Sequence, residues 1–199
     1  MRFIDDVVHG KGLRAVLAES KDAITAALTV LRTSVSEGLG TLCTGKLAAS
    51  VQAVPRQYRH TKRKPPTAPS AYVGSIFGPL QTFADKNTST FGASIVTEWV
   101  HQAVIQTAKK FEVAVSAVLA QQQKVDVQLG KVKRMRGGTK ADAGGMSDFE
   151  KIRTQLHFDV AGFAEKASSF GEALAQDPAI LQLIKVVDDA AVAAPAAVA

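Results

Sequence analysis

Residues that commonly act as nucleophiles or metal ligands are few and scattered in this sequence. Its histidines are His9, His60, His101 and His157. None of the four has a second ligand-type residue at the spacing of a zinc site, and the single cysteine, Cys43, has no histidine placed near it by local structure. We therefore expect surface or half-buried positions for the histidines, a small buried position for Cys43, and no bound metal.

Paired carboxylates and glycine-rich turns also occur, but without the context that their chemistry requires. Asp5-Asp6 and Asp188-Asp189 are sequence neighbours near the chain ends, where we expect solvated charges. Gly137-Gly138 and Gly144-Gly145 are not preceded by a strand, which a phosphate-binding loop needs. We therefore expect no active site, no cofactor and no enzymatic activity.

Two basic clusters are the remaining candidates for a binding site. Their side chains could contact anionic lipid, at about 1 kcal/mol per residue, or the phosphates of nucleic acid. A solvated loop and a favourable cationic helix end are the simpler interpretation. Nucleic-acid recognition usually interleaves aromatic residues with basic ones, and only Tyr58 is available, so we expect no nucleic-acid partner. The candidate anionic-surface contacts are Arg56, Arg59, Lys62, Arg63, Lys64, Lys131, Lys133 and Arg134.

Composition places the chain among folded proteins without a membrane span. Of its 199 residues 46% are hydrophobic and 21% charged, with a net charge of +6, so it can bury a core. One cysteine indicates a reducing compartment. The N-terminus has two acids where a signal peptide needs an apolar run, and no stretch approaches the ~18–20 apolar residues of a span. Any membrane contact is therefore expected to be peripheral.

Helical periodicity dominates the first quarter of the chain. Apolar residues recur at three- and four-residue steps over residues 12–53, which predicts helix. The stripe consists of Leu13, Val16, Leu17, Ile24, Leu28, Leu31, Val35, Leu39 and Leu42. Gly38 and Gly40 interrupt it, and because each costs about 1 kcal/mol in a helix interior, we expect a break into two helices there. Four prolines between Pro55 and Pro69 predict an extended linker or loop over residues 54–69, without helix.

The middle of the chain predicts a short helix, a polar turn and a long helix. Ser70 is the expected N-cap of a helix that ends near Phe83, and residues 85–90 are expected to form the turn. One apolar face then continues from residue 92 to residue 135 with Trp99 beside it, and its spacing of about 3.6 residues demands no sustained supercoil. That face comprises Val96, Val100, Ala103, Thr107, Phe111, Ala114, Val118, Val125, Leu129 and Val132.

The last third has the clearest helix-start signals. Residues 136–145 form a flexible linker by composition. Ser147 and Glu150 have the spacing of a capping box, and Asp177-Pro178 suits a cap followed by the first helical residue. The apolar positions that follow these starts are Phe149, Ile152, Leu156, Val160, Phe163, Ala167, Phe170, Leu174, Ile180, Leu183, Ile184 and Val187.

These patterns predict an all-α protein. We expect an elongated helical bundle or rod of about five to six helices, joined by proline-rich and glycine-rich linkers, with no strand. The expected units are an N-terminal helical segment at 1–54, a C-terminal helical domain at 55–190 with a flexible linker at 136–146, and a disordered tail at 191–199.

Two segments in order resemble the C-terminal region of the family of conserved oligomeric Golgi complex subunit 2. The first segment is PRQYRHTKRKPPTAPSAYV, residues 55–73, and the second is GGMSDFEKIRTQLHFDV, residues 144–160. Matching positions are Pro55, Arg56, Tyr58, Arg59, Thr61, Pro66, Ser70, Tyr72, Val73, Pro79, Leu80, Gly145, Met146, Ser147, Asp148, Lys151, Ile152, Arg153, Gln155, Leu156, Asp159 and Val160. The resemblance covers about residues 55–187.

This resemblance implies a non-enzymatic subunit of a vesicle-tethering complex that acts in retrograde intra-Golgi transport. It implies a peripheral protein on the cytosolic side of the Golgi membrane. The implied partners are subunits one, three and four of the same lobe and, through the complex, SNAREs, Rab GTPases and coiled-coil tethers. Subunits of the family are several times longer and carry an N-terminal coiled-coil region, so we expect this chain to be a fragment, a partial gene model or a truncated form. The alternatives are a basic nucleic-acid-binding helical protein and another helical adaptor.

Overall fold

The computed structural model describes residues 2–59, 61, 63–135 and 146–192. Within these residues the chain forms eight helices and no strand, which confirms the all-α prediction. Their bounds are α1 Arg2–Thr44, α2 Leu47–Tyr58, α3 Ala71–Ser75, α4 Gly78–Phe91, α5 Ala93–Met135, α6 Asp148–Ser168, α7 Glu172–Ala175 and α8 Pro178–Val192.

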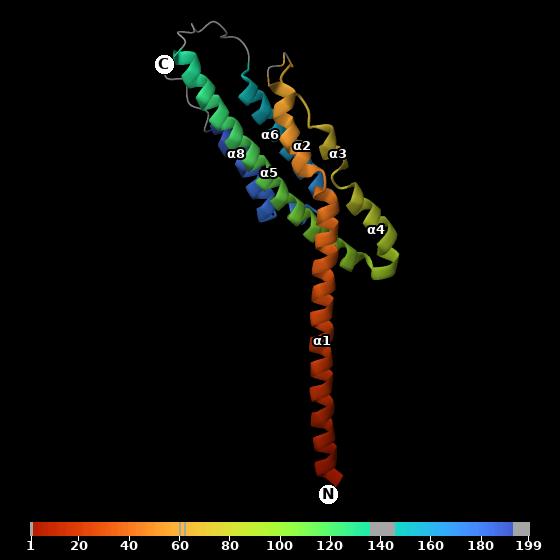
Figure 1. The fold of residues 1–199 in the computed structure, drawn as a ribbon. Helices are drawn as coiled ribbons and strands as arrows, with labels where there is room; N and C mark the ends of the chain where they lie inside the picture. The colour runs from red at the N-terminus through yellow and green to blue at the C-terminus, as the bar shows by residue number, and fades with distance from the viewer. Residues whose placement is uncertain (1, 60, 62, 136–145, 193–199) are drawn as a thin grey trace.

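Helix α1 projects from a packed body formed by the other helices (Figure 1). It is 43 residues long, and only its C-terminal turns contact the body. Leu39 and Cys43 are buried there, and Arg32 forms an ion pair with Glu98 of α5 at 3.0 Å. The N-terminal end of α1 lies far from every other element (Figure 1). The molecule is therefore a helical body with one long helical arm.

Helix α5 is the centre of the body, since α1, α2, α4, α6 and α8 all pack against it. Its predicted apolar face is buried from Val96 to Val118 except at Ala114, which is partly buried, whereas Leu129 is half exposed. Phe111 is fully buried, and its ring lies 5.3 Å from that of Phe163 on α6. The predicted inward faces of α6 and α8 are confirmed by the burial of Ile152, Leu156, Val160, Phe163, Ala167, Ile180, Leu183 and Val187.

The predicted break at Gly38 and Gly40 is wrong, because α1 continues through both glycines to Thr44. The two glycines differ in their surroundings. A Cβ on Gly40 would lie 3.0 Å from Gln106 Oε1 of α5, whereas one on Gly38 would meet nothing within 4 Å. Gly40 therefore permits the close approach of two helices. The chain instead turns at residues 45–46, between α1 and α2.

The prediction that no helix passes through Pro55 is also wrong, since α2 runs to Tyr58 with Pro55 inside it. A proline in a helix interior costs about 3 kcal/mol or more. Packing compensates for this cost, because Val51, Val54, Pro55 and Tyr58 are all buried. The extended segment begins at Arg59, whose N–H donates to the Pro55 carbonyl at 3.0 Å.

The predicted polar turn at 85–90 is wrong as well, because these residues belong to α4. The Asn87 amide donates to the Phe83 carbonyl at 2.8 Å, and the Thr88 hydroxyl donates to the Ala84 carbonyl at 2.6 Å. These polar side chains therefore bond back onto their own helix. The helix ends at Gly92, whose φ of 83° favours glycine.

Two predicted segments fall largely outside the described residues. Of the linker at 136–146 only Met146 is described, and of the tail at 191–199 only the two residues that end α8. The segment 70–83 contains two helices, α3 and α4, separated at Ile76-Phe77.

The capping box at the start of α6 is confirmed. The Glu150 N–H donates to Ser147 Oγ at 3.1 Å, and the Ser147 N–H donates to Glu150 Oε2 at 2.7 Å. Asp177 similarly caps α8 by accepting from the Ala179 N–H at 2.8 Å. Both helix starts therefore satisfy amides that the helix itself leaves free.

Replacing Ser147 by alanine is expected to lower the free energy of unfolding by about 1 kcal/mol, because a first-turn amide loses its acceptor. Urea denaturation followed by circular dichroism measures this change. Ser147→Asp keeps an acceptor and is the matched control, with an expected loss below about 0.5 kcal/mol. An unchanged midpoint for Ser147→Ala would contradict the cap.

Candidate functional site

The two segments that carry the family resemblance meet in the structure at a buried carboxylate. Asp159 on α6 is fully buried. Its Oδ1 accepts from the Ser70 N–H at 2.6 Å and the Gln155 amide at 2.9 Å. Its Oδ2 accepts from the Ser70 hydroxyl at 2.9 Å and the Tyr72 hydroxyl at 2.8 Å. We call these four residues, Ser70, Tyr72, Gln155 and Asp159, the Asp159 clasp.

The clasp extends to the end of α2 through Gln155. The Tyr58 hydroxyl donates to Gln155 Oε1 at 2.7 Å, and the Gln155 amide also donates to the Ala68 carbonyl at 3.0 Å. Gln155 and Asp159 are four residues apart, so both lie on one face of α6. The chain between α2 and α3 is thereby tied to α6 at both of its ends. A buried polar cluster whose groups are this fully bonded fixes the position of a segment.

Ser70 was predicted as the N-cap of the following helix, and it does occupy that position, with φ −64° and ψ 149°. Its side chain makes no cap bond to α3. The hydroxyl and the backbone N–H instead both donate to Asp159. The residue therefore joins two parts of the chain rather than only starting a helix.

Gly162 lets the proline-rich segment lie directly against α6. A Cβ at this position would lie 2.8 Å from Pro69 Cγ and 3.1 Å from Pro69 Cβ. The pyrrolidine ring cannot rotate away as a flexible side chain would. The contact places Pro69 one turn from Asp159 on α6 and so positions Ser70 for its two hydrogen bonds.

Gly162→Ala is expected to destabilise the protein by up to about 2 kcal/mol in net effect. The added methyl group overpacks against Pro69 at a cost of about 1–3 kcal/mol, which exceeds the gain of about 1 kcal/mol from replacing glycine in a helix. Urea denaturation provides the measurement. Gly38→Ala has open space around it and is the control that should stabilise α1. Stabilisation by Gly162→Ala would disprove the close contact.

Alkaline pH is expected to weaken the clasp. Burial, together with the charge of Asp159 and the hydrogen bond to it, raises the pKa of Tyr72. An unfolded tyrosine loses its proton near pH ~10, whereas folded Tyr72 retains it. The unfolded state therefore binds fewer protons above that pH, and stability falls as pH rises. The slope of unfolding free energy against pH above about 10 should be smaller for Tyr72→Phe; an unchanged slope would contradict the assignment.

Cys43 is buried in the fold, and His101 and His157 make contacts with other residues of the chain. Cys43 is buried, and its burial raises the pKa of the thiol to about 11, so it stays protonated at neutral pH. This confirms the predicted small buried position. His101 Nε2 lies 2.9 Å from the Phe170 carbonyl oxygen, and His157 Nδ1 lies 3.4 Å from Asp188 Oδ1. Among the described residues, no group of three His, Cys, Asp or Glu side chains could hold a metal ion.

Four of the predicted basic contacts have described side chains, and all four are exposed. Two of them also form hydrogen bonds within the chain. Arg59 donates to Gln122 Oε1 at 3.1 Å. Arg63 donates to Gln57 Oε1 at 2.9 Å and lies 5.8 Å from the centre of the Tyr58 ring.

Arg56 and Lys64 are exposed. Lys62 lies outside the described residues, and Lys131, Lys133 and Arg134 lie in the last turns of α5, where only the backbone is described. A role for these residues in contacting an anionic surface stays a prediction.

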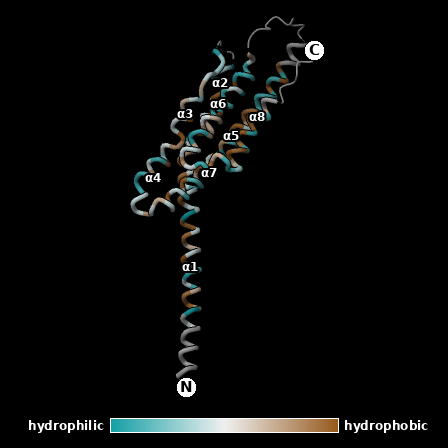
Figure 2. Tube along the Cα trace, turned by 180° about the vertical axis from the view of Figure 1, so that it is seen from behind, coloured by the Kyte–Doolittle hydropathy of each residue, from teal (hydrophilic) through white to brown (hydrophobic). Residues whose placement is uncertain are grey.

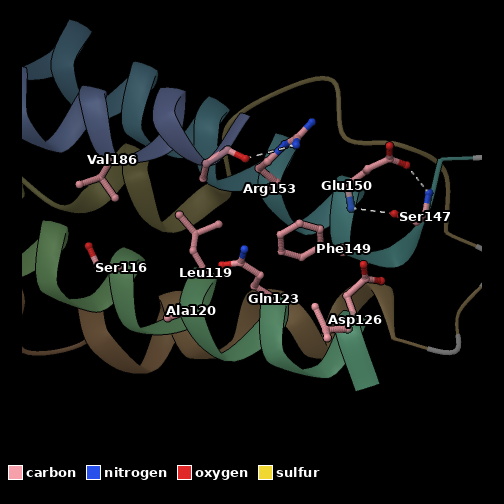
Figure 3. Close-up of a pocket in the computed structure, with 12 residues that line it drawn as sticks. Ser116, Leu119, Ala120, Gln123, Asp126, Ser147, Phe149, Glu150, Arg153 and Val186 are labelled. Atoms are coloured by element: carbon pink, nitrogen blue, oxygen red, sulfur yellow. Dashed lines mark hydrogen bonds between the residues drawn. The ribbon is translucent and has the colours of Figure 1, made fainter. Parts of the chain in front are cut away.

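A groove of about 440 Å³ lies where α5 and α8 meet the start of α6 (Figure 3). Its walls include the apolar side chains of Leu119 and Phe149. Some of its polar side chains already serve the fold. Glu150 belongs to the capping box, and Arg153 donates to the Ala190 carbonyl at 3.4 Å. The Arg153 hydrogen bond thus ties α6 to the last turn of α8 beside the groove.

Half of the large apolar side chains that are exposed among the described residues lie on α1, the helix that projects from the body in Figure 2. Ile24 is 61% exposed, Leu28 55% and Leu42 66%. The other large apolar side chains exposed on this helix are Val16, Leu17, Val30 and Leu31. Clusters of exposed apolar side chains are typical of sites that contact another protein or a membrane. The stripe predicted over residues 12–53 is therefore present, but most of its α1 residues are exposed, whereas Leu39 is buried. No described helix is long and apolar enough to cross a lipid bilayer.

Comparison with known proteins gives consistent matches to one family. The family model described as "COG complex component, COG2, C-terminal" matches residues 5–160. The conserved oligomeric Golgi complex subunit 2 of Homo sapiens is 31% identical over 163 residues, covering 80% of this chain and 22% of the human protein. That of Drosophila melanogaster is 30% identical over 183 residues, covering 87% of this chain and 26% of the fly protein. No solved structure matches.

The match extends further towards the N-terminus than residue 55, where the sequence resemblance begins. A third relative, subunit 2 of Dictyostelium discoideum, is 29% identical over 118 residues, covering 57% of this chain and 13% of the relative. The chain thus spans about a quarter or less of the length of these relatives. Nearly all of helix α1, most of the body and the Asp159 clasp fall within the matched range, and the chain belongs to the family of the C-terminal region of COG complex component 2.

Proposed function

We propose that the chain is a non-enzymatic part of a Golgi vesicle-tethering complex and that it acts in retrograde intra-Golgi transport. The observation that carries this proposal is the match of residues 5–160 to the COG2 C-terminal family. The relatives are named as subunits of the conserved oligomeric Golgi complex. Contacts with other proteins, rather than conversion of a substrate, are the activity that we assign.

The form of the molecule supports this role. The projecting arm α1 exposes apolar side chains to solvent over most of its described length, while the body is held rigid by the Asp159 clasp. A rigid body with an exposed apolar helix is suited to binding another helix through periodic anchor residues. Bound partners would cover surface that costs free energy when it faces water.

The partners that we propose are other subunits of the same complex, with subunits one, three and four as the first candidates. SNAREs, Rab GTPases and coiled-coil tethers would be reached through the assembled complex. We place the protein on the cytosolic side of the Golgi membrane as a peripheral component.

Affinity capture from cells tests the proposal. The tagged chain and a full-length subunit 2 are expressed in parallel, and co-purifying proteins are identified at low and moderate salt. Recovery of the other Golgi complex subunits supports the assignment. Nucleic acid that is lost at moderate salt, without Golgi complex subunits from either form, would overturn it.

A further inference from the structure

Six apolar residues of α1 follow a heptad repeat, and all of them except the partly buried Val35 are exposed. Leu17, Ile24 and Leu31 are seven residues apart, and Leu28, Val35 and Leu42 form a second series offset from the first by four residues. These are the d and a positions of a coiled coil, respectively. We call the positions from residue 17 to residue 42 on this face the α1 seam. At ~1.5 Å per residue the seam is about 39 Å long.

The body of the protein covers only part of the seam, since Val35 is partly buried against the core while the other apolar seam residues are exposed. Leu39, Gly40 and Cys43 face the body and are buried, whereas Leu42 is 66% exposed although it neighbours Cys43. At 3.6 residues per turn, the seam lies roughly a quarter-turn around α1 from this buried face. Leu17, Ile24, Leu28 and Leu31 are all exposed by 46% or more. The seam is thus a separate face of the helix.

Two positions break the apolar pattern, and neither is explained by contacts within the chain. Lys21 occupies an a position and Gly38 a d position. Gly38 is exposed, and a Cβ there would meet nothing within 4 Å. A glycine in a helix interior costs about 1 kcal/mol, so this residue weakens α1 without relieving any crowding in the monomer.

We propose that the α1 seam pairs with the seam of a second copy of this chain in antiparallel orientation. In an antiparallel coiled coil, a positions of one helix pack against d positions of the other. A single register places Leu28 beside Leu31, Ile24 beside Val35 and Leu17 beside Leu42, so that every such layer is apolar. The same register sets Lys21 opposite Gly38, where the missing side chain leaves room for the lysine. Both interruptions are thereby explained by one arrangement.

Parallel pairing of the same seam is unfavourable. Each residue would then face its own copy, which brings two Lys21 ammonium groups together and leaves an empty layer at Gly38. The flanking e and g positions raise no charge conflict in the antiparallel form, because Arg32 is held by Glu98 of its own chain at 3.0 Å. The other flanking residues upstream of the body are small and uncharged, namely Ala18, Ser20, Thr25, Ala27 and Ser34.

Sedimentation of the purified full chain tests whether the seam pairs. We expect a dimer in the micromolar range, and we expect Leu28→Glu to raise the dissociation constant at least about tenfold because it buries a charge at the centre of the pair. Val30 is as exposed as Leu28, at 66% against 55%, but lies on the far side of α1, so Val30→Glu is the matched control and leaves the constant unchanged. Circular dichroism verifies that both variants keep their helix content.

Opposite charges at position 38 test the register. Gly38→Glu and Gly38→Lys both remove the glycine, so their intrinsic effects on the helix are similar. Only the first places an opposite charge beside Lys21 of the second copy. We expect the glutamate variant to dimerise about tenfold more tightly than the lysine variant, since two such contacts form per dimer. Adding Lys21→Glu to Gly38→Lys should restore the affinity.

Cysteine cross-linking in a Cys43→Ala background completes the test. Chains carrying Leu17→Cys should form a disulfide with chains carrying Leu42→Cys and not with their own kind. A chain that stays monomeric at high micromolar concentration, or cross-links between two Leu17→Cys chains, would overturn the proposal. The test uses purified protein alone, so its outcome is independent of membership of the Golgi complex.

Discussion

Replacing Asp159 by alanine is expected to lower the free energy of unfolding by about 3–5 kcal/mol, because the change removes one acceptor group and leaves several buried donors without a partner. The Ser70 N–H, the hydroxyls of Ser70 and Tyr72, and the Gln155 amide all donate to this carboxylate. Asp159 is fully buried, so water cannot replace the lost oxygens without opening the structure. The segment before α3 would lose its anchor on α6.

Urea denaturation of the purified chain measures this loss. Asp188→Ala is the matched control, because that carboxylate is half exposed and lies 3.4 Å from His157 on the surface, where an ion pair contributes about 0–1 kcal/mol. Asp159→Asn keeps the shape and one acceptor oxygen, so its effect should fall between the two. Equal losses for Asp159→Ala and Asp188→Ala would show that the clasp does not stabilise the fold.

The helices and their inward faces could be predicted from the sequence because both depend on local information. The faces of α5, α6 and α8 repeat with the helical period, and the capping box at Ser147 is fixed by four consecutive residues. The errors arose where tertiary packing outweighs local preference. Pro55 lies inside α2 because the burial of its neighbours compensates for its cost. Gly40 lies where α1 contacts α5 and does not interrupt α1.

The Asp159 clasp could not be located from spacing, since Ser70 and Asp159 are 89 residues apart. A signal was nevertheless present, because Gln155 and Asp159 are polar residues on a face of α6 that also carries Ile152 and Leu156. Polar side chains in such a stripe require buried partners. The tyrosines and the serine of the first resemblance segment supply them. The two resemblance segments thus contain all the residues of one buried cluster.

Periodicity also could not separate the buried helices from the exposed arm. The stripe on α1 has the same three- and four-residue steps as the stripe on α5, yet Leu28 is 55% exposed whereas Phe111 is fully buried. A repeat shows that a helix has an apolar face. Whether the same chain covers that face depends on where the other helices end.

Phe111→Ala is expected to destabilise the protein by about 3–5 kcal/mol, the range for removing a large aromatic side chain from a well-packed core. Phe111 has no exposed surface. Its ring lies 5.3 Å from Phe163 of α6 at 71° and 6.4 Å from Tyr72 of α3 at 74°, and such edge contacts add about 0.5–1.5 kcal/mol beyond burial. The residue therefore joins the central helix to the element that carries the Tyr72 hydroxyl.

Phe91→Ala is the control with the same chemistry, because Phe91 is 44% exposed and touches Trp99 at 5.3 Å; its expected loss is below about 1.5 kcal/mol. A double variant with Asp159→Ala separates packing from hydrogen bonding. Both changes act on Tyr72, so the two losses should sum to more than the double variant shows, by about 0.5–3 kcal/mol. Strict additivity would mean that Phe111 stabilises the core without positioning Tyr72 for Asp159.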